Sequence, residues 1–377
     1  MKIAIVGSGA AAVSAAEAAL KQNPDAQVAL FSEDPHLPYF RPRLAEVLAK
    51  EGMDEKILLH PQKWYDENEI HLHLGTSVTS LDPQKKELSL ENGNKESYDK
   101  LILATGSRSF VPPIPGVEHR GVYTLWTLDQ AREIRSSLKP GDQVVVIGGG
   151  LLGLEAAWQL HRGGASVSVI ESLDRLLANQ MDEVGSALFK AKVESLGIQV
   201  FTGSNTKAIL AEDGNVCGVE LSTGEILPAT AVLVSTGVRA RTELAEAVGI
   251  KIDRRIQVNS RMETSLPDIY AAGDNVEMEG KWYGLWTISL QEGAVAGKNA
   301  AGGDAQYEMP VPPYMLSTMD TKVMSAGNLK TEEGQTVELK EDKENFTYRK
   351  LVYKDDKLQG FLLMGDTSEG LNLRKQL

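Results

Sequence analysis

The sequence predicts an α/β protein in which one strand–turn–helix–strand unit occurs twice and a small α+β segment follows. In each copy an apolar strand runs into a glycine-rich turn, Gly7-Ser-Gly-Ala-Ala-Ala12 in the first and Gly148-Gly-Gly-Leu-Leu-Gly153 in the second. Each turn opens a helical stretch rich in alanine and leucine, and a second apolar strand then leads to an acid, Glu33 or Glu171. Strands that alternate with helices in this way predict two parallel sheets.

The residue types in the two turns have a physical reason. The first glycine permits the tight turn, the second lets backbone N–H groups approach a pyrophosphate, and the third position must be small so that helix and strand can pack. A single turn of this kind could merely join a strand to a helix. Two complete units, each with an acid placed to hold a ribose diol, predict two Rossmann-like dinucleotide-binding domains. The candidate binding residues are Gly7, Gly9, Ala10, Ala11, Ala12 and Glu33 in the first copy, and Gly148, Gly150, Gly153 and Glu171 in the second.

The ends of the two units support the duplication and set the expected domains. In both units an apolar strand runs into Thr-Gly, at Thr105-Gly106 and at Thr236-Gly237. The segment Ile269-Tyr-Ala-Ala-Gly-Asp274 then introduces a region without a third glycine turn of its own. We therefore expect a discontinuous first domain at residues 1–115 and 242–305, a second domain at residues 116–241, and a small α+β domain at residues 306–377.

Composition excludes several classes of partner. The formal net charge of -13 argues against nucleic acid or an anionic membrane as the main partner. The single cysteine, Cys217, cannot form a disulfide within the chain, and we interpret it as a small core residue in a reducing compartment. Gly7, Gly9 and Glu17 interrupt the first apolar stretch, which argues against a signal peptide. No stretch has the apolar length of a membrane span, so we expect a cytoplasmic protein.

These residues resemble the two-dinucleotide-binding-domain flavoproteins of glutathione-reductase-like topology, in which FAD occupies the first domain and a nicotinamide cofactor the second. The segment Leu37-Pro-Tyr-Phe-Arg-Pro-Arg-Leu44 is similar to the hallmark of the rubredoxin and ferredoxin reductase branch. The resemblance implies that Arg41 and Pro42 lie against FAD and that Gly273-Asp274 forms the second FAD fingerprint. It also implies a helix that begins near Trp286 and directs its positive end at the flavin. The remaining cofactor-binding candidates are Val78, Ala104, Thr105, Gly106 and Gly237.

The resemblance also implies a reaction. Hydride would pass from NADH to FAD, and electrons would then leave one at a time to a small redox protein such as rubredoxin. Glu171 favours NADH over NADPH, because a carboxylate accepts the ribose hydroxyls and repels a 2′-phosphate. Arg175 lies beyond the usual phosphate-contacting position. The protein's task is to stack and tune the two cofactors, and no dedicated nucleophile is required.

The chain departs from this family at two positions. A lysine often stands where this sequence has Glu46, and it pairs with a glutamate at the position of Glu155. Two carboxylates cannot form that ion pair, so either one is protonated or the two are separated. We take the departure to favour the rubredoxin reductase branch. Glu155, two residues after the second glycine turn, is a candidate for catalysis and for cofactor binding, with a plain surface carboxylate as the alternative interpretation. Leu316 stands where the family usually has tryptophan.

Other functions stay open on the sequence alone. An oxidase or diaphorase would use oxygen or a quinone-like acceptor, a non-enzymatic flavoprotein would only respond to NADH, and a nitrite reductase would carry a similar module at its N-terminus. Disulfide- and peroxide-reducing branches are excluded, because they need cysteines near the flavin and Cys217 lies in the second unit. An acidic carrier would need a local basic face, for which the candidates are Arg41, Arg43, Arg108 and Lys322. His71 and His73 share a strand face and predict no metal site, and the oligomeric state stays open.

Overall fold

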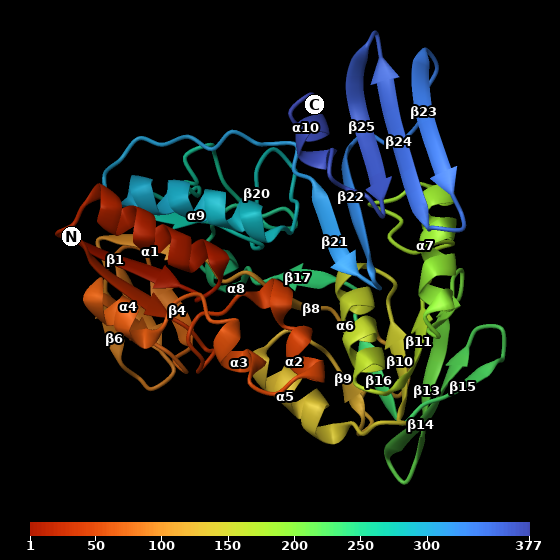
Figure 1. Ribbon diagram of the computed structural model, residues 1–377. Helices are drawn as coiled ribbons and strands as arrows, with labels where there is room; N and C mark the ends of the chain where they lie inside the picture. Colours follow the sequence, from red (N-terminus) through yellow and green to blue (C-terminus); the bar gives the residue numbers. More distant parts are fainter. The chain divides into compact units, whose positions relative to one another are not determined.

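The computed structural model describes all 377 residues, which form two compact units (Figure 1). Unit 1 contains residues 1–44, 52–108 and 238–309, and unit 2 contains residues 45–51, 109–237 and 310–377. The short segment 45–51 therefore belongs to unit 2, although the chain on both sides of it belongs to unit 1. The domain boundaries expected from the sequence stay a prediction.

A five-stranded parallel sheet forms the centre of unit 1, with the strand order β19-β7-β1-β2-β3. Its strands are β1 (Lys2–Val6), β2 (Gln27–Phe31), β3 (Ile70–His73), β7 (Lys100–Leu103) and β19 (Ile269–Ala271). β1 lies between β2, which is the next strand in the chain, and β7, which follows much later. Ligands of doubly wound α/β proteins bind where the strand order reverses in this way, at the carboxyl ends of the strands.

Two helices of unit 1 pack against each other at backbone distance, α1 (Ala10–Gln22) and α9 (Trp286–Ala300) (Figure 1). A Cβ atom added to Gly293 would lie 2.3 Å from the Ala11 carbonyl oxygen, and one added to Gly297 would lie 2.0 Å from the Ala15 carbonyl oxygen. Only glycine allows this approach, although glycine weakens a helix by roughly 1 kcal/mol relative to alanine. The contact fixes α9 against α1.

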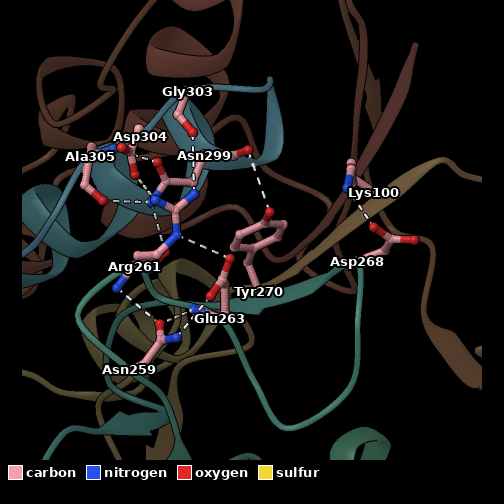
Figure 2. Close-up of polar contacts among 10 residues, drawn as sticks. All are labelled: Lys100, Asn259, Arg261, Glu263, Asp268, Tyr270, Asn299, Gly303, Asp304 and Ala305. Carbon is pink, nitrogen blue, oxygen red and sulfur yellow. Dashed lines mark hydrogen bonds and ion pairs between the residues drawn. The ribbon is translucent and has the colours of Figure 1, made fainter.

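A polar network holds the end of α9 to the segment that leads into β19 (Figure 2). The Asn299 side-chain amide donates to the carbonyl oxygens of Arg261 at 2.9 Å and Ala305 at 2.8 Å. The Tyr270 hydroxyl donates to the Asn299 carbonyl oxygen at 3.4 Å. Arg261 itself forms ion pairs with Glu263 and Asp304. The network fixes both the end of α9 and the start of the strand beside it.

The smaller elements of unit 1 surround this centre. The antiparallel sheet β4-β5-β6 consists of β4 (Val78–Asp82), β5 (Glu87–Leu90) and β6 (Lys95–Ser97). β18 (Ile256–Gln257) pairs with β20 (Val276–Glu277). The short helices are η1 (Arg41–Arg43), α3 (Met53–Lys56), α4 (Gln62–Glu67) and α8 (Glu243–Glu246). β8 (Ser107–Ser109) and β17 (Val238–Ala240) lie where the chain passes between the units.

Unit 2 repeats the parallel sheet, with the strand order β12-β11-β10-β16-β9. Its strands are β9 (Val122–Tyr123), β10 (Gln143–Ile147), β11 (Ser166–Ile170), β12 (Gln199–Phe201) and β16 (Ala231–Val234). β10 lies between β11 and β16, as β1 lies between β2 and β7. The predicted pair of Rossmann-like sheets is therefore confirmed.

The remaining elements of this sheet's region are α2 (Glu46–Ala49), α5 (Leu128–Ser137), α6 (Leu151–Arg162), α7 (Glu183–Ser195) and the antiparallel strands β13 (Thr206–Glu212), β14 (Asn215–Leu221) and β15 (Ile226–Pro228). The interpretation of Cys217 as a core residue is wrong. Cys217 lies on β14 between the buried Val216 and Gly218, and its side chain is exposed. Strand residues alternate between two faces, and Cys217 falls on the open one.

The C-terminal part of unit 2 is a five-stranded antiparallel sheet with the order β21-β22-β25-β24-β23. Its elements are β21 (Tyr314–Thr318), β22 (Thr321–Gly327), β23 (Gln335–Asp342), β24 (Thr347–Lys354), β25 (Lys357–Met364) and the helix α10 (Gly370–Arg374). Asp182, which caps α7, accepts hydrogen bonds from the Tyr348 hydroxyl at 2.9 Å and the Lys350 ammonium at 2.8 Å on β24.

Among the helices of the chain, none combines the length and the apolar character that crossing a bilayer requires.

Candidate functional site

The first glycine turn lies at the carboxyl end of the sheet of unit 1. The Gly7 N–H donates to the Phe31 carbonyl oxygen at 2.8 Å, and Gly7 has a φ of +127°. A Cβ atom at this position would lie 2.1 Å from the Ala104 carbonyl oxygen, so no side chain fits. Ala104 begins the Ala-Thr-Gly segment after β7, and the two predicted binding segments therefore touch.

The second glycine turn repeats this geometry in unit 2. The Gly148 N–H donates to the Ile170 carbonyl oxygen at 2.7 Å, and Gly148 has a φ of +122°. A Cβ atom there would lie 2.1 Å from the Ser235 carbonyl oxygen. The two turns thus agree in hydrogen bond, conformation and the backbone that excludes a side chain.

The two glycine turns differ at the last position of the motif, where a small residue is required. A Cβ atom on Gly153 would lie 2.1 Å from the Gly148 carbonyl oxygen, whereas Ala12 accommodates its methyl group with no exposed surface. Both helices begin after a glycine, Gly9 or Gly150, without a side-chain cap and with open space where a Cβ atom would stand. Uncapped helix N-termini with unobstructed N–H groups fit the pyrophosphate of a dinucleotide.

The acids at the ends of the second strands have different partners. In unit 1, Glu33 forms an ion pair with Arg241. In unit 2, Glu171 accepts the N–H of Gly149 at 2.7 Å and that of Leu173 at 2.8 Å. Glu171 therefore lies directly against the second glycine turn, where the sequence predicts a ribose-binding acid. Its contact with a ribose stays a prediction.

The Gly273-Asp274 pair follows β19 at the same end of the first sheet. Gly273 has a φ of +94°, and Asp274 accepts a hydrogen bond from the Ser107 hydroxyl at 3.2 Å. Burial raises the pKa of Asp274, although the charges of Arg41 and Arg255 oppose the rise. A carboxyl group that the protein shields from water suits a hydrogen bond to a bound polar chain.

The other FAD candidates are distributed over unit 1. Thr105 donates its hydroxyl to the Arg241 carbonyl oxygen at 2.7 Å. Trp286 is the first residue of α9, as predicted, and meets Phe40 edge to face at 4.9 Å between ring centres. Val78 begins β4 and pairs with Leu90. The remaining candidates lie as follows: Arg41 and Pro42 in η1, Ala10, Ala11 and Ala12 in the first turn of α1, Gly106 after β7, and Gly237 in unit 2 with a φ of +101°.

The structure answers the question of Glu46 and Glu155. Both belong to unit 2, where α2 packs against α6. Burial, and secondly the charge of Glu46, raise the pKa of Glu155 to about 7. The two carboxylates are therefore not separated, and Glu155 holds a proton over much of the range in which an ordinary glutamate is ionised.

Sequence reasoning missed two residues in unit 1, Glu292 and Arg255. Glu292 on α9 accepts the Gly273 N–H at 2.9 Å, and the side chain of Arg255 stacks on the Trp282 ring at 3.5 Å from its centre. Glu292 stands immediately before Gly293, and its partner Gly273 lies in another segment, so the sequence pattern of α9 does not indicate the contact.

The basic residues and histidines singled out in the sequence are distributed over both units. Arg108, one candidate for a basic face, forms an ion pair with Glu243 at 2.6 Å. Arg41 and Arg43 lie in η1 of unit 1, and Lys322 lies in β22 of unit 2. His73 stacks on Phe31 at 4.5 Å, and no group of three or more His, Cys, Asp or Glu side chains could hold a metal ion.

The chain matches two protein-family models. The model of the pyridine nucleotide-disulphide oxidoreductases covers residues 1–293, and the model of the rubredoxin NAD+ reductase C-terminal domain covers residues 312–377. The chain belongs to the pyridine nucleotide-disulphide oxidoreductase family. Its single cysteine means that no disulfide forms within this chain, whatever the family's name.

Individual proteins agree with this assignment. The NADH-rubredoxin oxidoreductase of Clostridium acetobutylicum is 33% identical over 100% of this chain and 94% of its own length. A nitrite reductase of Bacillus subtilis is 33% identical over 99% of this chain, but the match spans only 46% of that protein, about half of its length. The crystal structure of a ferredoxin reductase from Rhodopseudomonas palustris superposes with a TM-score of 0.91 at 27% identity, covering 99% of this chain and 93% of the other.

The family, the duplicated fold and the two fitting glycine turns together establish the class of protein. The chain is an oxidoreductase that uses FAD and NADH.

Proposed function

We propose that this protein transfers electrons from NADH through FAD to a small redox protein such as rubredoxin. The observation that carries the proposal is the full-length similarity to the NADH-rubredoxin oxidoreductase, including a C-terminal segment that matches the rubredoxin reductase model. The duplicated glycine turns support it, because two dinucleotides need two such turns.

The site residues of the proposal divide between the units. FAD would be held in unit 1 by the first glycine turn, the segment after β7 and the Gly273-Asp274 pair. NADH would be held in unit 2 by the second turn and Glu171. The further residues assigned to FAD are Glu33, Arg41, Pro42, Val78 and Trp286, and those assigned to NADH are Glu155 and Gly237.

The chemistry that FAD supplies when bound is two-electron uptake from NADH and one-electron release to an acceptor. The residues of this chain bind the two cofactors, select the coenzyme and handle protons. The first turns of α1 and α6 offer N–H groups to the two pyrophosphates. Glu171 selects NADH, because its charge repels a 2′-phosphate. Glu155 holds a proton near neutral pH and is our candidate for a proton-handling residue.

A cytoplasmic location is part of the proposal. NADH is available there, and the exposed thiol of Cys217 is compatible with a reducing compartment.

Anaerobic reduction tests the proposal. The purified protein is mixed with NADH and the flavin absorbance is followed, and then a rubredoxin, a ferredoxin or oxygen is added. We expect rapid bleaching by NADH and rapid reoxidation by rubredoxin. A flavin that NADH does not bleach would contradict electron transfer, and fast reoxidation by oxygen alone would favour an oxidase.

The similarity to nitrite reductase supplies a second candidate, an electron-delivery module for a larger reductase. It differs from the first in its acceptor. A rubredoxin that fails to reoxidise the reduced protein, together with a nitrite reductase fragment that succeeds, would favour this candidate.

A further inference from the structure

Glu292 lies on the inner side of α9, next to the turn that follows β19. Its carboxyl oxygen accepts the Gly273 N–H at 2.9 Å. Gly273 is buried and has a φ of +94°, and its N–H has no place in the sheet. A buried N–H without an acceptor is destabilising, so this hydrogen bond contributes to holding the turn in the conformation that presents Asp274.

Glu292 cannot easily move away from this position. The next residue, Gly293, brings α9 to within backbone distance of Ala11 in the first turn of α1, and the network of Figure 2 holds the end of the same helix. The side chain is therefore fixed between two of the segments that we assign to FAD, the first glycine turn and the Gly273-Asp274 pair.

The surroundings of Glu292 disfavour its charged form. Burial raises the pKa of Glu292 to about 8; the hydrogen bond from the Gly273 N–H opposes this rise, and the charge of Asp274 adds to it. The Tyr307 hydroxyl is buried without a hydrogen-bond partner, and the charge of Glu292, after burial, raises the pKa of that phenol. Arg41 and Arg255 act on Asp274, and neither is among the groups that affect Glu292.

The charged groups on the elements packed against α9 have partners elsewhere. On α1, Glu17 contacts His60 at 2.9 Å, and Lys21 lines an outer groove with that histidine. On β7, Lys100 pairs with Asp268 at 2.5 Å. On β19, the Tyr270 hydroxyl donates to the Asn299 carbonyl oxygen. No cation therefore compensates an ionised Glu292.

We propose that Glu292 is a positioning residue for FAD, which holds the Gly273-Asp274 turn through its hydrogen bond and couples FAD binding to the uptake of a proton. The inference rests on the assignment of FAD to unit 1. FAD brings a doubly charged pyrophosphate to these segments, so the protein binds it more tightly when Glu292 is neutral. Loss of the proton above pH 8 adds a negative charge beside Asp274 and weakens binding.

The test measures the FAD dissociation constant between pH 6.5 and 9.0, from the fluorescence of FAD released on dilution. For the unmodified protein we expect the constant to rise up to about tenfold between pH 8 and 9, the limit for loss of one proton. Glu292→Gln keeps a neutral acceptor for the Gly273 N–H and should bind FAD with a constant that changes less than twofold. Glu292→Ala removes both the acceptor and the titrating group, so it should bind FAD about tenfold more weakly than the unmodified protein at pH 6.5, with a dissociation constant that changes little up to pH 9. Glu279→Gln, an exposed glutamate on the nearby loop, is the matched control and should behave as the unmodified protein.

Calorimetry in two buffers of different ionisation enthalpy measures independently how many protons the protein takes up when FAD binds. We expect net proton uptake on FAD binding at pH 8.5, and none for Glu292→Gln. A pH-independent dissociation constant, or zero proton uptake in the unmodified protein, would overturn the inference, as would equal pH dependence in Glu292→Gln. A protein that binds FAD with this pH dependence but is not reduced by NADH would refute the proposed function alone.

Discussion

Replacing Glu46 with lysine is expected to lower the pKa of Glu155 from about 7 toward its ordinary value of 4.5. The difference between these values amounts to roughly 3 kcal/mol between the protonated and ionised forms. Burial is the larger cause of the rise and the charge of Glu46 the second, so Glu46→Gln should lower the pKa only in part. Glu46→Lys adds an attraction and should lower it further.

The sign of the effect on stability follows from the same values. The folded protein holds the proton of Glu155 more tightly than the unfolded chain does. The free energy of unfolding therefore falls as the pH rises from about 4.5 to about 7, and is level above. In Glu46→Lys this fall should become smaller, so the variant gains part of these roughly 3 kcal/mol over the unmodified protein at pH 8.

Carbon-13 NMR of glutamate side-chain carboxyl groups measures this pKa directly. The Glu155 signal is the one that Glu155→Gln removes. Glu51→Lys makes the same change of charge at an exposed neighbour outside α2, and it should leave the titration near pH 7 unchanged. A Glu155 signal that still titrates near pH 7 in Glu46→Lys would refute the reasoning.

Three further substitutions test other parts of the structure. Gly153→Ala places a methyl group 2.1 Å from a backbone oxygen, so it should lower the free energy of unfolding in urea by roughly 1–3 kcal/mol and weaken NADH binding. Ala12→Gly should lower the free energy of unfolding by only about 1 kcal/mol. Equal effects would contradict the difference between the two turns. Lys350→Met leaves the partly buried carboxylate of Asp182 without its cation and should cost roughly 3 kcal/mol, again by urea unfolding. A loss below 1 kcal/mol would show that the pair is unimportant. Glu171→Ala should bring the Michaelis constants for NADH and NADPH closer together, and an unchanged ratio would remove the role in coenzyme choice that we give to this acid.

The sequence predicts the two glycine turns well because their geometry is local. Gly7 and Gly148 have φ values of +127° and +122°, which glycine adopts without the strain that other residues would suffer. A motif whose members lie within one strand–turn–helix unit can be identified before the fold is known.

Contacts between distant segments could not be predicted in the same way. Gly293 is needed because α9 meets Ala11, more than 250 residues earlier in the chain, and Glu292 matters because its partner, Gly273, belongs to another segment. The exposure of Cys217 depends on which face of β14 is covered, which its apolar neighbours do not reveal. The membership of residues 45–51 in unit 2 likewise depends on tertiary packing alone.

The backbone contact between α1 and α9 has a consequence for synthesis on the ribosome. The first sheet needs β19 at its edge, and α1 needs Gly293 and Gly297 against its alanine face. Both arrive only after the whole of residues 109–237 has been made. The nascent N-terminal segment therefore has an open strand edge and an uncovered helix during the time in which the complete second sheet can form. This condition favours chaperone binding. It also makes the order of folding differ from the order of translation.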